Sequence, residues 1–82
     1  MYKALINIMP LSNLLDPQGK AVLGGLHNLG VTTVTNVRVG KHITLTIEAN
    51  NETEATTIAD QAAKQLLANA VMEQYEITVE KI

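Results

Sequence analysis

The first segment of the chain alternates between apolar and polar residues with the period of a β-strand. Residues 2–9 read YKALINIM, so Tyr2 and every second residue after it share one face, while the residues between them share the other. Pro10 follows, and proline cannot donate a hydrogen bond to a strand ladder. We therefore predict a first strand over residues 2–9 and a loop after it.

Apolar residues take up helical spacing after this loop. Asp16 can cap the free N–H groups at the start of a helix, and Pro17 suits the first helical position. One face of the helix carries the apolar side chains of Val22, Leu26 and Leu29. Gly30 is typical of the residue that closes a helix in the left-handed conformation.

Two segments rich in β-branched residues follow, VTTVTNVRV at 31–39 and ITLTIEA at 43–49. A three-residue loop, Gly40 to His42, joins them into a hairpin that keeps the apolar residues of both strands on one face. This register pairs Val39 with Ile43 and Val37 with Leu45.

A second helix and a last strand complete the pattern. Asn50 or Asn51 can cap the helix, which we expect to end near Asn69, and residues 75–82 alternate again as a strand. The apolar positions at helical spacing are Ala55, Ile58, Ala59, Ala62 and Leu66. The order β-α-β-β-α-β predicts an α+β, ferredoxin-like fold, with a four-stranded antiparallel sheet and two helices on one face.

Length and composition limit the functions that the chain can have. Its 82 residues predict a single domain, 1–82, with a small core that oligomerisation would support, so we expect a homodimer or higher oligomer. A net charge of −2 and only two aromatic residues argue against nucleic-acid binding. No apolar run is long enough to span a membrane, and no cysteine is present. We expect a cytoplasmic protein without a membrane partner.

A search for catalytic chemistry gives little. The Gly-Lys pairs lack the glycine that a phosphate-binding loop requires, and GxGxxG is absent. The two imidazoles, His27 and His42, are predicted to lie on a solvated helix face and beside a hairpin loop. No cluster of His, Asp and Glu has the spacing of a metal site. The residues by themselves predict no catalytic, cofactor-binding or metal-binding site.

Glycines in the first helix raise a question, because each glycine inside a helix costs about 0.5–1 kcal/mol relative to alanine. Gly25 borders the apolar face, where it can let the helix approach its sheet. Gly24 points away from that face. We predict that Gly24 leaves the outer face open to close approach by another polypeptide.

Several short segments together resemble a known family. These are LDPQG at 15–19, LHNLG at 26–30, VRVGK at 37–41 and LLANAV at 66–71, followed by Glu73 and Tyr75. In this order they resemble PurS, the small subunit of bacterial phosphoribosylformylglycinamidine synthase. The resemblance spans nearly the whole chain. One departure is Ala70, where many members carry proline.

The resemblance implies a function that composition and spacing do not show. In this family the small subunit joins a glutaminase subunit, PurQ, to an ATP-dependent synthetase subunit, PurL. The complex uses ATP, Mg and glutamine for a C–N ligase reaction in purine biosynthesis. The small subunit is expected to bind no cofactor and to carry no catalytic residue. Its expected role is to dock the two enzymes and help ammonia pass between them.

We expect the contacts with partners at the first helix and at the predicted hairpin tip. The expected interface residues are Asp16, Pro17, Gly19, Gly24, Arg38, Gly40 and Lys41. An alternative function is a regulatory module of the same fold that binds a small ligand such as an amino acid. Its site would lie around Asn13, Asp16 and Gly19.

Overall fold

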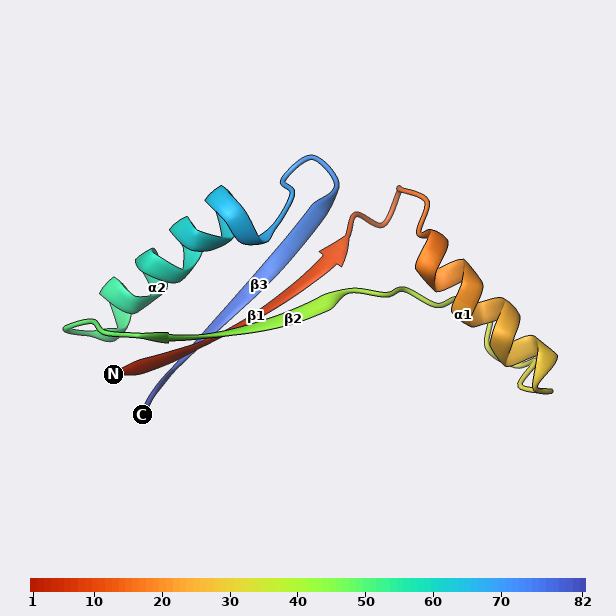
Figure 1. The fold of residues 1–82 in the computed structure, drawn as a ribbon, viewed down its shortest axis with the longest axis horizontal. Coiled ribbons are helices and arrows are strands. Elements are labelled where there is room, and N and C mark those ends of the chain that lie inside the picture. The colour runs from red at the N-terminus through yellow and green to blue at the C-terminus, as the bar shows by residue number, and fades with distance from the viewer.

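The computed structural model describes residues 1–82 and contains three strands, two α-helices and one π-helical turn (Figure 1). In chain order they are β1 (Tyr2–Pro10), α1 (Pro17–Asn28), β2 (Lys41–Ile47), α2 (Glu52–Ala62), the π-helical turn η1 (Ala63–Leu67) and β3 (Glu73–Lys81). Neither α1 nor α2 has the length and hydrophobicity that a membrane-spanning helix requires.

The three strands form one antiparallel sheet in the order β2-β1-β3. The register places Ile6 of β1 between Ile43 of β2 and Ile77 of β3. The predicted alternation along the first strand is confirmed, because Ala4, Ile6 and Ile8 are fully buried. The central position of β1 explains this burial, since strands flank it on both edges.

The core lies between the sheet and α2. Asn51 caps this helix by accepting a hydrogen bond from the N–H of Glu54 at 2.8 Å. Ala55 and Ala59 are fully buried against the isoleucines of β1, and their small side chains let the helix lie close to the sheet. The cluster of buried residues contains no side chain from α1.

The second helix ends in a π-helical turn, in which the N–H of Ala68 bonds to the carbonyl of Ala63 at 2.9 Å. A π turn takes up an extra residue and so shifts the side chains that follow it. Leu67 therefore packs against the core, while Leu66 is 84% exposed. The prediction that places Leu66 on the apolar face of the helix is wrong for this reason.

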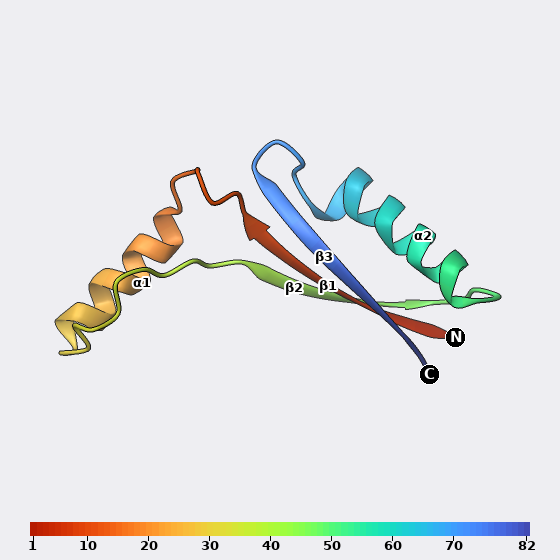
Figure 2. The ribbon, with the colours of Figure 1, turned by 180° about the vertical axis from the view of Figure 1, so that it is seen from behind.

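Residues 11–40 leave the sheet as a single extension, called the arm below. In it α1 runs outward and the chain returns beside it as an extended segment that makes no strand ladder. The two views of the ribbon agree that α1 and α2 lie at opposite ends of the molecule (Figures 1 and 2). The molecule measures 51 × 27 × 14 Å along its principal axes.

The α+β class is therefore confirmed, but three details of the predicted fold are wrong. The sheet has three strands and not four, because residues 32–33 form a turn and residues 34–39 pair with no strand of the sheet. The two helices do not cover one face. The predicted hairpin around residues 40–42 is absent, since the chain continues straight from the arm into β2. Gly40 accordingly has no positive φ, which only Gly30 shows, at 91°.

Candidate docking surface

The arm is fixed to the sheet at its base, where the chain leaves β1 and returns to β2. Asp16 contributes both of its carboxylate oxygens. Oδ1 accepts a hydrogen bond from the N–H of Gly19 at 3.0 Å, and Oδ2 accepts one from the N–H of Val39 at 2.8 Å. The bond from Val39, followed by that from Gly19, lowers the pKa of Asp16, because both stabilise the ionised carboxylate. One side chain thus caps α1 and holds the returning chain.

Arg38 forms a second tie at the same place. Its guanidinium donates to the carbonyl oxygens of Pro10 at 3.0 Å, Leu11 at 2.7 Å and Leu14 at 3.4 Å. These carbonyls belong to the end of β1 and the loop after it. A planar guanidinium with five N–H donors can bond several carbonyls at once, which an ammonium group does less well. The side chain therefore folds back onto its own chain and does not point outward from a hairpin tip.

Two glycines allow the close packing that these bonds require. A Cβ on Gly19 would overlap the carbonyl oxygen of Val37, and one on Gly40 would overlap Sδ of Met9 and the carbonyl oxygen of Ile8. Gly19 is buried between α1 and the returning segment. Both glycines are explained by contacts within this chain.

The outer part of the arm is held less firmly. Nε2 of His27 lies 2.8 Å from the carbonyl oxygen of Val34, which joins the helix to the returning segment. By contrast, a Cβ on Gly24 or Gly25 would meet nothing within 4 Å. Gly25 therefore does not bring the helix close to its own sheet, and the prediction that it would is wrong.

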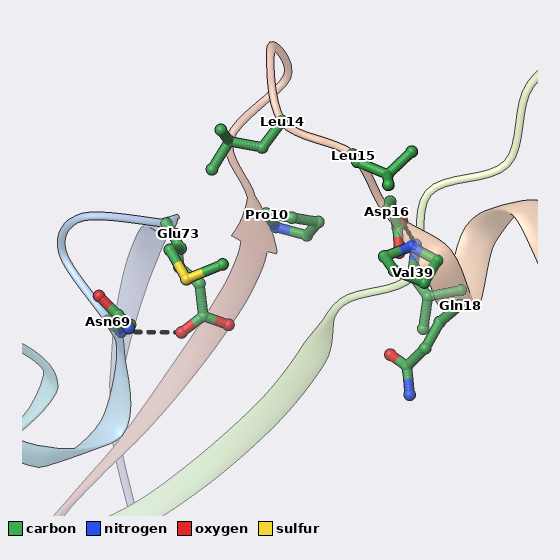
Figure 3. A pocket seen from close by; sticks show the side chains of 10 residues that line it. Pro10, Leu14, Leu15, Asp16, Gln18, Val39, Asn69 and Glu73 are labelled. Carbon is green, nitrogen blue, oxygen red and sulfur yellow. Dashed lines mark hydrogen bonds between the residues drawn. The ribbon is translucent and has the colours of Figure 1, made fainter.

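A hollow of about 450 Å³ lies beside the base of the arm (Figure 3). Pro10, at the end of β1, separates Asn69 and Glu73 on one side from Asp16 and Val39 on the other (Figure 3). Glu73 accepts a hydrogen bond from the N–H of Asn69 at 2.8 Å. Both carboxylates that line the hollow are therefore engaged by backbone N–H groups of this chain.

The rim of the hollow and its neighbourhood are apolar and exposed. Leu15 is 66% exposed and Met72 is 53% exposed, and both line the hollow. Val71, next to Met72 in the chain, is 80% exposed. We call these three residues the apolar rim. Exposed apolar side chains beside satisfied polar groups suit a polypeptide partner better than a charged small ligand.

A separate polar cluster joins α2 to β3. The hydroxyl of Tyr75 donates to Oδ1 of Asp60 at 2.8 Å, and Nζ of Lys64 lies 3.0 Å from Oδ2 of the same carboxylate. The bond from Tyr75, followed by that from Lys64, lowers the pKa of Asp60. The same contacts raise the pKa values of Tyr75 and Lys64. Each of these three side chains is stabilised in the protonation state that it has at neutral pH. We therefore interpret the cluster as a structural link between α2 and β3.

Comparison with known proteins decides the family. The model of the family "PurS: Phosphoribosylformylglycinamidine (FGAM) synthase" matches residues 3–81. This chain belongs to the PurS family. The PurS subunit of phosphoribosylformylglycinamidine synthase from Synechocystis is 46% identical over 79 residues, covering 94% of this chain and 79% of the relative.

Solved PurS structures show the same fold. The crystal structure of Methanocaldococcus jannaschii PurS, one of the subunits of formylglycinamide ribonucleotide amidotransferase in the purine biosynthetic pathway, superposes with a TM-score of 0.91 at 38% identity. It covers 100% of this chain and 99% of the other. A chain in the structure of PurLQS from Thermotoga maritima matches with a TM-score of 0.88 at 34% identity, covering 96% of each chain. Because these matches cover 96–100% of this chain, they include the arm.

The structure brings together most of the residues that the sequence singled out. Those at the base of the arm are Asp16, Pro17, Gly19, Arg38, Gly40 and Lys41. Lys41 lies 3.8 Å from Glu73, beside the hollow. Gly24 lies apart from them, in the middle of α1.

Sequence reasoning missed the apolar rim. Its residues lie in the loops after β1 and before β3, which the hydrophobic pattern assigns to no element. The available signal was the presence of Leu15, Val71 and Met72 in segments that build neither a strand nor a helix face. Sequence alone did not show that the two loops meet at one end of the sheet.

Proposed function

We propose that this PurS-family chain is a non-catalytic bridging subunit of phosphoribosylformylglycinamidine synthase in purine biosynthesis. In this role it docks a glutaminase subunit, PurQ, to an ATP-dependent synthetase subunit, PurL, and aids the transfer of ammonia between them. ATP, Mg and glutamine are used by the complex, and none of them by this subunit.

The observation that carries the proposal is the apolar rim beside a base whose charged groups are already bonded. Both carboxylate oxygens of Asp16, the guanidinium of Arg38 and Oε1 of Glu73 bond to this chain's own backbone. These bonds make the three side chains structural supports of the base. What remains open is an apolar surface of the kind that partner proteins cover. Ammonia would be protonated and lost in bulk water, so the two enzymes gain from being held together.

Co-purification with PurQ and PurL from the same organism tests this proposal, with and without glutamine and ADP. Leu15→Glu places a charge in the apolar rim. Ile82→Glu is the matched control, because Ile82 is 63% exposed and lies beyond the other end of β3. We expect Leu15→Glu to reduce complex formation and glutamine-dependent synthesis at least tenfold, and Ile82→Glu to leave both unchanged. Equal complex formation and equal synthesis by the two variants would show that the apolar rim is not part of the interface.

We also propose that the chain works as a homodimer or higher oligomer, in which the fourth strand of the ferredoxin-like sheet is formed. The radius of gyration supports this. It is 16.1 Å for the single chain, whereas a compact domain of this length is expected to have a radius of about 12 Å. Only 8 of 82 residues are buried, so the single chain leaves most of its apolar side chains open to a further copy.

A further inference from the structure

The outer edge of β3 is open along the whole strand. β3 is the last strand in the order β2-β1-β3, and it pairs with β1 without interruption from Glu73 opposite Pro10 to Lys81 opposite Tyr2. In an antiparallel ladder, alternate residues direct their N–H and C=O groups away from the partner strand. The only backbone bond that β3 makes outside the sheet joins Glu73 to Asn69, at the start of the strand. β3 therefore offers a row of unpaired backbone groups to an added strand.

Two carboxylates beside this edge have no partner in the chain. Glu76 and Glu80 are exposed and lie on the same face of β3, with Thr78 between them. Neither forms an ion pair, even though Lys3 of β1 lies opposite Glu80. The edge thus combines open backbone groups with two free negative charges four residues apart.

These charges argue against a second copy of β3 at the same edge. If two β3 strands paired antiparallel around Thr78, Glu76 of each copy would lie opposite Glu80 of the other. Like charges directly opposite each other destabilise a strand pair, whereas opposite charges stabilise it. The edge therefore favours a strand that carries basic side chains at both positions.

The core side of the same edge has room for further side chains. A second hollow, of about 430 Å³, lies between α2 and β3 and is lined by Thr56, Thr57, Asp60, Tyr75 and Ile77. Its lining includes no residue of β1 or β2, which places it at the outer side of β3. Both threonine hydroxyls donate to carbonyl oxygens of their own helix, at 2.9 and 3.0 Å, and the tyrosine hydroxyl donates to the aspartate. Because these polar groups are already bonded, the second hollow suits small apolar side chains.

We propose that the outer edge of β3 binds an extended, basic segment of a partner polypeptide as an added strand. Two basic residues of the segment, four positions apart, lie opposite Glu76 and Glu80. Two small apolar residues between them lie opposite Ile77 and Val79, on the side of the second hollow. Backbone hydrogen bonds supply affinity and the alternating side chains select the sequence, as in other complexes formed by strand addition. This site is separate from the apolar rim and does not depend on the function proposed there.

A synthetic peptide tests the site on the natural, full chain. The capped peptide Lys-Val-Thr-Val-Lys is titrated into isotope-labelled protein, and the backbone amide signals are followed by NMR. We expect shifts along β3 and the facing side of α2. The dissociation constant should be at least about tenfold lower than that of Glu-Val-Thr-Val-Glu, because opposite charges across a strand pair attract and like charges repel.

Two N-methylated peptides separate strand addition from the attraction of charges alone. One carries methyl groups on both valine nitrogens, and the other carries one on the threonine nitrogen. Alternate N–H groups of a strand point to opposite sides, so only one of the two sets can face β3. We expect one of these peptides to lose binding and the other to keep it.

Charge-reversal variants test the two glutamates. Glu76→Lys combined with Glu80→Lys should reverse the preference, so that the acidic peptide binds more tightly. The matched control, Glu48→Lys with Glu52→Lys, changes the net charge equally at exposed positions outside β3 and should leave the preference unchanged. Shifts located away from β3, equal binding of the two N-methylated peptides, or a basic preference that survives the reversal would overturn the proposal. Absence of binding up to millimolar peptide would also overturn it, and would mean that the glutamates only protect an open edge.

Discussion

At the residue scale, two charged side chains of the arm, those of Asp16 and Arg38, hold its base together. The sequence marked Asp16 as a helix cap from its position before Pro17, and this is confirmed by its bond to Gly19. Its second bond, to Val39, joins residues 23 positions apart in the chain. A helix cap can be recognised from neighbouring residues in the sequence. A bond between distant residues depends on where the folded chain returns, which neighbouring residues do not show.

The lowered pKa of Asp16 predicts an acid-sensitive arm. Because the folded pKa lies below the ordinary value of 3.8, the unfolded state binds more protons at acid pH. The stabilisation is fully present above that ordinary value and is lost as the pH falls through the lowered one. Asp16→Asn should lower the melting temperature at pH 7 and weaken its dependence on pH below 4. Thermal unfolding between pH 2 and pH 7 measures this, with Glu80→Gln on β3 as the control. An unchanged pH profile in Asp16→Asn would contradict the prediction.

Arg38 and Lys41 are both predicted interface residues, but their contacts within the chain differ. Arg38→Ala removes a charged donor from three carbonyls and should cost about 1.5–3 kcal/mol of unfolding free energy. Lys41→Ala breaks only an ion pair at 3.8 Å, so its cost should be below about 0.5 kcal/mol. Urea unfolding of the two variants measures the difference. Equal unfolding free energies would show that Arg38 contributes no more to the fold than Lys41.

At the element scale, local patterns predicted which segments form the observed strands and helices, but not how all of these elements are arranged in space. The alternation of β1 and the caps of both helices were confirmed, because neighbouring residues determine them. The π turn at the end of α2 was not predicted. It adds one residue to a helical turn and so changes the directions of Leu66 and Leu67, but it leaves no signature in the local composition of the sequence. The segment 31–39 has strand composition, yet residues 32–33 form a turn and no part of the segment pairs with a strand of its own chain.

The role of Gly24 in an interface stays a prediction, and Gly25 provides a matched control. A methyl group on Gly24 or on Gly25 would have no neighbour within 4 Å, so alanine fits at both positions. Each substitution should stabilise α1 by about 0.5–1 kcal/mol through helix propensity, which raises the melting temperature by roughly 2–8 °C in a domain of this size. If Gly24 alone admits a close neighbour, only Gly24→Ala should reduce assembly with PurQ and PurL. A stabilised Gly24→Ala variant that assembles normally would show that the glycine is merely tolerated.

At the scale of the whole molecule, the single chain does not close on itself. We predicted a four-stranded sheet because strands that are neighbours in the sequence usually pair within one chain when the connection between them is short. Gly40, where the chain runs straight from the arm into β2, packs against Ile8 and Met9, and no local pattern contains these contacts. The apolar rim was missed for a related reason, because it forms only where two loops meet at the end of the sheet. Long-range geometry thus determines both surfaces that we assign to partners.

The proposed homo-oligomer links folding to association, so stability should depend on protein concentration. Dissociated chains would expose the apolar face of α1 and the open edge of β2, and mass action then favours the folded dimer as concentration rises. Each tenfold increase stabilises a dimer by about 1.4 kcal/mol. We expect the melting temperature, followed by circular dichroism, to rise by several degrees between micromolar and hundred-micromolar protein. A melting temperature that stays constant over this range would mean that each copy folds alone, and that α1 and β2 find no partner in a second copy.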